Sequence, residues 1–128
     1  MASKKIQIGS REVEMLAVSS CNYFYRRIFD EDPFELQARA VSSMKSSVIG
    51  AMGITFAMQM GFVMKSMAEA HGDRSVMNQL NIDDYLDWID QFSTFDFAEP
   101  SGDIIELYSM QNKQHSSEKK EDAAPSGN

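Results

Sequence analysis

The sequence predicts a mainly α-helical domain with an N-terminal β-hairpin and a disordered C-terminal tail. Three observations predict this fold class. Residues 4–15 alternate apolar and polar side chains, later segments repeat apolar side chains at helical spacing, and residues 113–128 contain no large apolar side chain. Because the chain has 128 residues, we expect one domain over residues 1–112, followed by the tail at 113–128.

The strand pattern covers residues 4–15 and is divided by the dipeptide Gly9-Ser10. A two-residue loop that begins with glycine is typical of a type II′ turn, which joins antiparallel strands. Two strands are marginally stable alone, so their apolar face should pack against helices. That face is expected to contain Ile6, Ile8, Val13 and Met15.

Helices are predicted over about 19–30, 33–70, 82–92 and 97–112. Capping residues support their starts, because short polar side chains can accept hydrogen bonds from free helical N–H groups. The candidate caps are Ser19 or Ser20, Asp32 before Pro33, Asn81, and either Asp96 or a later start at Ser101. Gly50 and Gly53 form a candidate break in the helix 33–70, whose continuity is left open.

The acidic residues are concentrated near the C-terminal end of the expected domain. The net charge is −7, and residues 81–112 contain eight acidic residues and no lysine or arginine. On the helix 82–92, the acidic residues lie mainly opposite an expected apolar face of Ile82, Tyr85, Leu86, Ile89 and Phe92. This acidic surface consists of Asp83, Asp84, Asp87 and Asp90. It should repel nucleic acid, so no nucleic-acid partner is expected.

Residue types suited to catalysis are scarce. The chain has one cysteine, Cys21, and two histidines, which do not provide the converging ligands of a zinc site. Ser42 and Lys45 match the S-x-x-K spacing of some serine enzymes, but the companion motifs are missing. We therefore expect no metal, no cofactor and no enzymatic activity, and an intracellular location.

Methionines are concentrated in the second half of the predicted helix 33–70. The chain has ten methionines, and several belong to a stripe at helical spacing. Methionine adapts to varied apolar partners, which suggests a partner-binding surface, while ordinary core packing is an equally good explanation. The Met stripe consists of Met52, Phe56, Met60, Val63 and Met67.

The same region allows a second interpretation, a small single-span membrane protein. Residues 46–64 carry no charge, and Gly53, Ala57 and Gly61 form a small-residue seam of the kind that membrane helices use in packing. Polar residues inside the run, and the lack of tryptophan or tyrosine at its ends, disfavour membrane insertion. A helix enclosed by other elements is the preferred interpretation.

Several segments together resemble the tail assembly chaperones of long-tailed, siphovirus-type bacteriophages, in particular those of Gram-positive hosts. They are the opening KKIQIGSREVEML, the helix CNYFYRRIF and the closing block at residues 81–112. In this block an acidic-aromatic helix contains Tyr85 to Ile89, a phenylalanine-rich turn runs from Phe92 to Phe97, and a second helix contains Asp103 to Tyr108. The resemblance covers about residues 4–112, although the run from Gly50 to Met64 is more apolar than the family pattern.

The resemblance implies a non-catalytic function in the host cytoplasm. Such chaperones coat the apolar tape measure protein, keep it soluble, help to recruit tail tube protein and are absent from the finished virion. Many are also made in a longer, frameshifted form, and a homo-oligomer is left open. On this view the Met stripe binds tape measure helices, and the acidic surface selects basic partners. The membrane alternative would be a phage lysis component.

Overall fold

The computed structural model describes residues 2–44 and 51–112. An antiparallel hairpin of β1 (Ala2–Ile8) and β2 (Arg11–Ala17) precedes the helices. These are α1 (Cys21–Phe29), α2 (Pro33–Met44), α3 (Ala51–Glu69), α4 (Arg74–Met77), α5 (Ile82–Ile89), the 3-10 helix η1 (Thr94–Phe97) and α6 (Ser101–Met110). The predicted mainly helical fold with an N-terminal hairpin is confirmed, while the predicted disordered tail at 113–128 lies outside the described residues.

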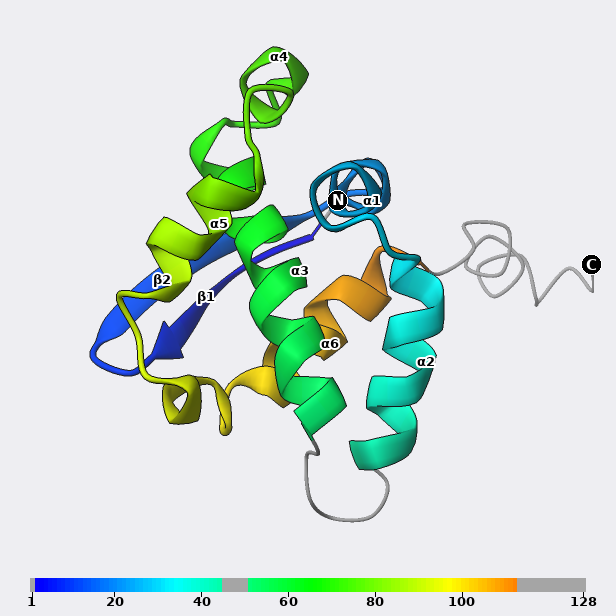
Figure 1. Ribbon diagram of the computed structural model, residues 1–128, viewed down its shortest axis with the longest axis vertical. Coiled ribbons are helices and arrows are strands. Elements are labelled where there is room, and N and C mark those ends of the chain that lie inside the picture. Colours follow the sequence, from blue (N-terminus) through cyan, green and yellow to red (C-terminus); the bar gives the residue numbers. More distant parts are fainter. Residues whose placement is uncertain (1, 45–50, 113–128) are drawn as a thin grey trace, which may run out of the picture.

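Helix α3 is the centre of the domain. It contacts β2, α1, α2, α5, η1 and α6, so other elements surround most of its circumference (Figure 1). Helix α2 runs beside α3 in the opposite direction (Figure 1). The sequence left the continuity of the helix 33–70 open, and the structure has two helices there, because α2 ends at Met44 and α3 begins at Ala51 and packs back along α2. Gly53 lies inside α3, and Gly50 lies outside the described residues.

The hairpin forms as the alternating pattern predicts. Ile6 pairs with Val13, and Ile8 pairs with Arg11 across the turn. Gly9 has a φ of 60°, which a glycine adopts without a steric penalty, while Ser10 keeps a negative φ, as a type II′ turn requires. The apolar face lies in the core, with Ile6, Ile8 and Met15 buried and Val13 half-buried.

Local capping chemistry accounts for most of the helix starts. The Asp32 carboxylate accepts a hydrogen bond from the Phe34 N–H at 2.9 Å, at the start of α2. Asn81 and Asp84 form a capping box at the start of α5. Ser20 occupies the N-cap position of α1, but its side chain makes no capping hydrogen bond.

The C-terminal helices differ in part from their predicted bounds. The start at Ser101 is confirmed for α6, and the start at residue 97 is wrong, since Asp96 instead closes a capping box with Ser93 on η1. Helix α5 ends at Ile89 and α6 at Met110, earlier than the predicted 92 and 112. The short helix α4, capped by Asp73, was not predicted.

Residues 70–81 connect α3 to α5 and contain α4. Gly72 has a φ of 78° after the end of α3, the left-handed conformation in which glycine commonly ends a helix, and His71 shares this conformation. The Arg27 guanidinium of α1 donates hydrogen bonds to the carbonyl oxygens of Met77 and Leu80, at 2.8 and 2.7 Å. These bonds hold the connection against α1.

Candidate partner-binding site

The Met stripe belongs to the hydrophobic core. Phe56, Met60 and Val63 have no exposed surface, and Met67 is 1% exposed. The Phe56 ring packs between the rings of Tyr25 and Tyr108, at centroid distances of 5.8 and 5.4 Å. The backbone of Met52 lies in α3, but its side chain is not described. For Phe56, Met60, Val63 and Met67 the core interpretation therefore holds in the folded domain, because the surrounding elements cover these four side chains and keep them from a partner.

None of the helices in the described ranges 2–44 and 51–112 is long and apolar enough to cross a bilayer. The small-residue seam of α3 has a different use in this fold. A Cβ on Gly61 would lie 3.3 Å from Met15 Cε and 3.7 Å from Ile104 Cδ1. The glycine thus allows α3 to approach both the hairpin and α6 closely.

The acidic surface lies on α5 and at its C-cap, Asp90, close to where the sequence placed it. Asp83, Asp87 and Asp90 are exposed, and no lysine or arginine of the described chain lies within ion-pair distance of them. Asp84 is half-buried, and its carboxylate accepts a hydrogen bond from the Asn81 N–H at 2.9 Å. Three of the four carboxylates are therefore available to a partner.

The buried face of α5 differs from its prediction. Tyr85, Trp88 and Ile89 are buried, whereas Ile82 and Leu86 are 43% and 45% exposed. Trp88 was left out of the predicted face, although it packs against the rings of Phe62, Phe92 and Phe97. The i, i+3, i+4, i+7 spacing of Tyr85, Trp88, Ile89 and Phe92 is the signal that identifies this face.

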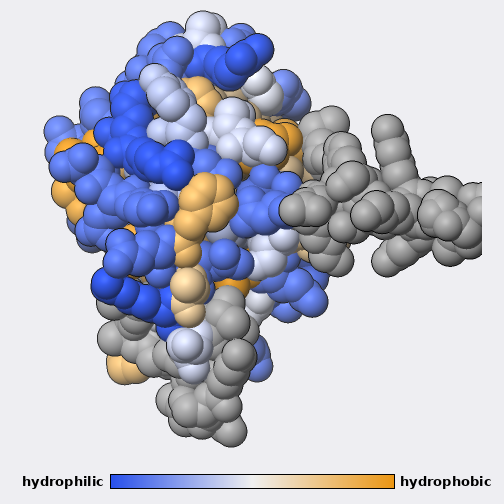
Figure 2. Space-filling model, turned by 90° about the vertical axis from the view of Figure 1, so that its right-hand side faces the viewer, coloured by the Kyte–Doolittle hydropathy of each residue, from blue (hydrophilic) through white to orange (hydrophobic). Residues whose placement is uncertain are grey.

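Exposed apolar side chains also occur elsewhere, but they are scattered over several elements. Tyr23, Phe34, Phe95 and Met110 are each at least 45% exposed and lie on α1, α2, η1 and α6. Figure 2 shows a mainly hydrophilic face crossed by a narrow apolar strip. Single apolar residues are normal on a protein surface. Helix α5 is distinguished by two exposed apolar residues, one turn apart, among free carboxylates.

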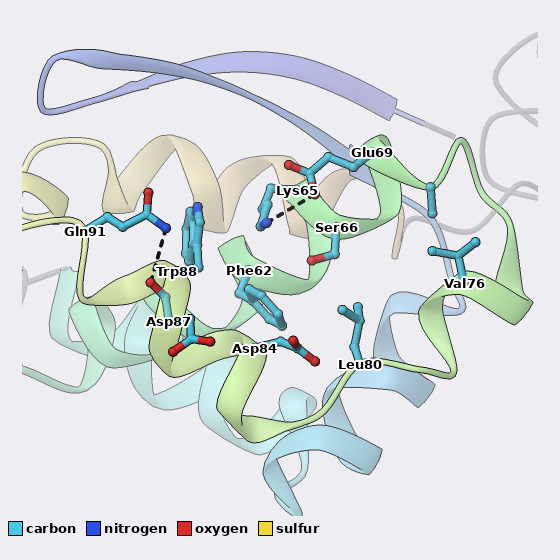
Figure 3. Close-up of a pocket in the computed structure, with 11 residues that line it drawn as sticks. Phe62, Lys65, Ser66, Glu69, Val76, Leu80, Asp84, Asp87, Trp88 and Gln91 are labelled. Carbon is cyan, nitrogen blue, oxygen red and sulfur yellow. Dashed lines mark hydrogen bonds and ion pairs between the residues drawn. The ribbon is translucent and has the colours of Figure 1, made fainter.

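A recess opens between α3, α5 and the connection that contains α4 (Figure 3). This α3–α5 recess has a volume of about 300 Å³. Its walls include Phe62, Lys65 and Ser66 from α3, and Asp84, Asp87 and Trp88 from α5. A second recess, of about 550 Å³, lies on the β2 side and shares Lys65, Glu69, Trp88 and Gln91 with the first.

Lys65 and Ser66 are the unusual polar groups of the α3–α5 recess. The Lys65 side chain is 14% exposed, and its Nζ lies 3.2 Å from Glu69 Oε1. The same ammonium lies 5.3 Å from the centre of the Phe62 ring and 5.5 Å from that of Trp88, a cation–π arrangement. Ser66 is 5% exposed, and its Oγ has no hydrogen-bond partner.

The titratable groups of the core are shifted by burial. Burial raises the pKa of the Cys21 thiol to about 11, so the thiol stays protonated at neutral pH and is a poor nucleophile. Burial also raises the pKa of Tyr85 to about 12 and the pKa of Tyr25 further in the same direction. In the described parts of the chain, no three histidine, cysteine or acidic side chains are grouped as metal ligands.

We expect these buried hydroxyl and thiol groups to make the domain unstable at alkaline pH. Their pKa values are higher in the folded chain than in the unfolded chain, so their stabilising effect is complete below pH 9. It is lost as the pH rises toward 11 and 12, since the unfolded state releases these protons first. Urea unfolding at pH 8, 9.5 and 11 should show a falling midpoint, with a smaller fall in Tyr85→Phe. A constant midpoint would contradict this.

Comparisons with protein-family models, with curated proteins and with solved structures found no significant match. The features that bear on function are thus the surface residues of this chain and the resemblance of its sequence pattern. Both lead to α5, which lies in the block at 81–112 and carries the exposed apolar and acidic side chains.

Proposed function

We propose that this protein is a tail assembly chaperone of a siphovirus-type bacteriophage. It binds the tape measure protein in the host cytoplasm, keeps that protein soluble and helps to recruit tail tube protein. A single observation carries the proposal: Ile82 and Leu86 are exposed among the carboxylates of α5, in the block that resembles this family. The role is one of binding, without catalysis, and the chaperone leaves before the virion is complete.

The surface chemistry of α5 suits a long, amphipathic helical partner. Ile82 and Leu86 lie one turn apart, so an apolar helix face laid across them would remove both from water. Each Å² of apolar surface that is covered stabilises the complex by about 25 cal/mol, before the costs of association. The neighbouring Asp83 and Asp90 select basic partners and keep the loaded complex soluble.

The tape measure protein binds to the exposed surface of α5 instead of to the Met stripe. The core position of Met60 and its neighbours leaves α5 as the amphipathic surface that a partner can reach without unfolding the chain. A longer frameshifted form, with a second domain added after the C-terminal residues, and self-association belong to the same proposal. Both are supported by the family resemblance.

Co-expression with the tape measure protein of the same phage tests the proposal. We expect the wild type to keep the tape measure protein in the supernatant and to co-purify with it. Leu86→Asp should reduce the co-purified amount several-fold, because a carboxylate replaces an apolar contact. Met110→Asp is the matched control, since Met110 is 50% exposed on α6, and it should bind as the wild type does.

Two results would contradict the proposal. The first is a tape measure protein that stays insoluble and does not co-purify with the wild type. The second is a gene for this protein without tail genes beside it. On the proposed function, the gene should overlap a downstream reading frame, which is followed by a very long gene that encodes a helical protein.

A further inference from the structure

The α3–α5 recess has the size and walls of a side-chain binding site. Its volume is about 300 Å³, about ten times the volume that one water molecule occupies in liquid water. This space is enough for one long side chain. The rings of Phe62 and Trp88 form one part of the wall, and Leu80 and Val76 form another (Figure 3). The recess can therefore hold the apolar stem of a side chain that enters from a partner.

The charge of the recess favours a cation. Three carboxylates line it, those of Glu69, Asp84 and Asp87, against the one ammonium of Lys65, which leaves a net charge of −2. Lys65 is already paired with Glu69 at 3.2 Å. Asp87 is exposed and has no lysine or arginine within ion-pair distance in the described chain. The position of Lys65 over two rings shows that these walls accommodate a positive group.

The Ser66 hydroxyl supplies an independent indication of a ligand. Ser66 is 5% exposed, yet its Oγ has no hydrogen-bond partner, and a buried polar group without a partner destabilises the fold. Figure 3 shows this hydroxyl turned toward the space that Phe62 and Leu80 border. A donor brought in by a ligand would satisfy the hydroxyl oxygen.

We propose that the α3–α5 recess receives an arginine side chain of the tape measure protein, an inference that rests on the proposed function for the identity of the partner. A guanidinium group has five N–H donors and a planar face. The Asp87 carboxylate and Ser66 Oγ both line the recess as acceptors for such donors, and the Phe62 and Trp88 rings line it as apolar faces for the planar group. A lysine ammonium lacks the planar face, and an anion would be repelled by the carboxylates. The bound arginine would fix the position of the tape measure segment that enters the recess, which lies on another side of α5 than Ile82 and Leu86.

Trp88 makes the recess directly observable. It is the only tryptophan of the chain and lines the recess, so the fluorescence emission of the chain reports on the surroundings of this one side chain. Overlapping labelled peptides of the tape measure protein are titrated against the full chain, and both peptide polarisation and Trp88 emission are recorded. We expect binding peptides to shift the emission. Replacing their arginine with citrulline, which is neutral and of similar shape, should weaken binding about tenfold.

Two variants of the recess and one control complete the test. Asp87→Asn and Ser66→Ala should each weaken binding by about three- to tenfold. Glu106→Gln removes the same charge from an exposed position on α6, outside the recess, and should bind as the wild type does. Ser66→Ala should also keep or raise the melting temperature, since it removes an unpaired buried hydroxyl. Weaker binding without lower stability is not expected of a purely structural serine.

The outcomes separate this inference from the proposed function. If no tape measure peptide binds the wild type, the proposed function fails. If peptides bind but citrulline, Asp87→Asn and Ser66→Ala leave the affinity unchanged, the recess inference is wrong and the chaperone function stands. Self-association of the wild type that Asp87→Asn abolishes would assign the recess to a second copy, and would also overturn the inference.

Discussion

Met60→Asp is expected to unfold the domain. Met60 has no exposed surface and lies on α3, the helix that most other elements contact. An aspartate there would bury an unpaired carboxylate or force α3 away from its neighbours, at a cost of several kcal/mol. Domains of this size are stable by only about 5–15 kcal/mol, so most molecules should lose their fold. Circular dichroism during heating should show a lost or strongly lowered transition.

Met60→Leu is the matched control for this substitution. It keeps the volume and apolar character of the side chain, so it should cost less than about 1.5 kcal/mol and preserve the transition. Leu86→Asp makes an apolar-to-acid change at a position that is 45% exposed, and should also remain folded. A Met60→Asp variant with an unchanged transition would show that the Met stripe is not core. Loss of partner binding in an unfolded Met60→Asp variant would identify no binding surface.

Gly61→Leu is the second substitution with a large expected effect. A Cβ alone at this position would lie 3.3 Å from Met15 Cε, and a leucine adds three further carbons in the same direction. The helix would have to move away from β2 and from Ile104 of α6, at a cost of about 3 kcal/mol. Urea unfolding should show a midpoint well below that of the wild type.

Gly61→Ala separates the effect of crowding from that of losing the glycine. Its Cβ meets the flexible end of the Met15 side chain, which can yield by a few tenths of an ångström. Replacing a glycine within a helix also stabilises that helix by about 1 kcal/mol. We therefore expect this variant to be close to the wild type in stability. Equal midpoints for the alanine and leucine variants would contradict the close packing of α3 against β2.

Boundaries set by short-range chemistry were predicted well. The Gly9-Ser10 turn, the Asp32 cap and the Asn81 cap all lie where the sequence placed them. In each case the deciding hydrogen bond or φ angle involves residues no more than three positions apart. Such features depend little on the rest of the fold.

Predictions that depended on distant residues were less accurate. The Met stripe was equally compatible with a partner surface and a core, and only the packing of β2, α1 and α6 around α3 shows that it is core. The buried face of α5 was misplaced although the spacing of Tyr85, Trp88, Ile89 and Phe92 marks it, because two overlapping apolar faces were possible and the packing of Trp88 on Phe62 of α3 decides between them. The α3–α5 recess joins side chains about twenty residues apart, and no local pattern indicates it.

The amino-acid order thus accounts for the hairpin, most of the helix starts and the acidic character of α5, because each depends on neighbouring residues or on composition. The folding of α2 back along α3, the burial of Met60 and the presence of Ser66 and Asp87 in the walls of one recess required the assembled domain. The physical reason is that the apolar surface of a helix such as α3 must be buried, but the sequence of the helix does not determine which other elements bury it. The choice among covering elements is made by packing, which also decides what remains exposed for a partner.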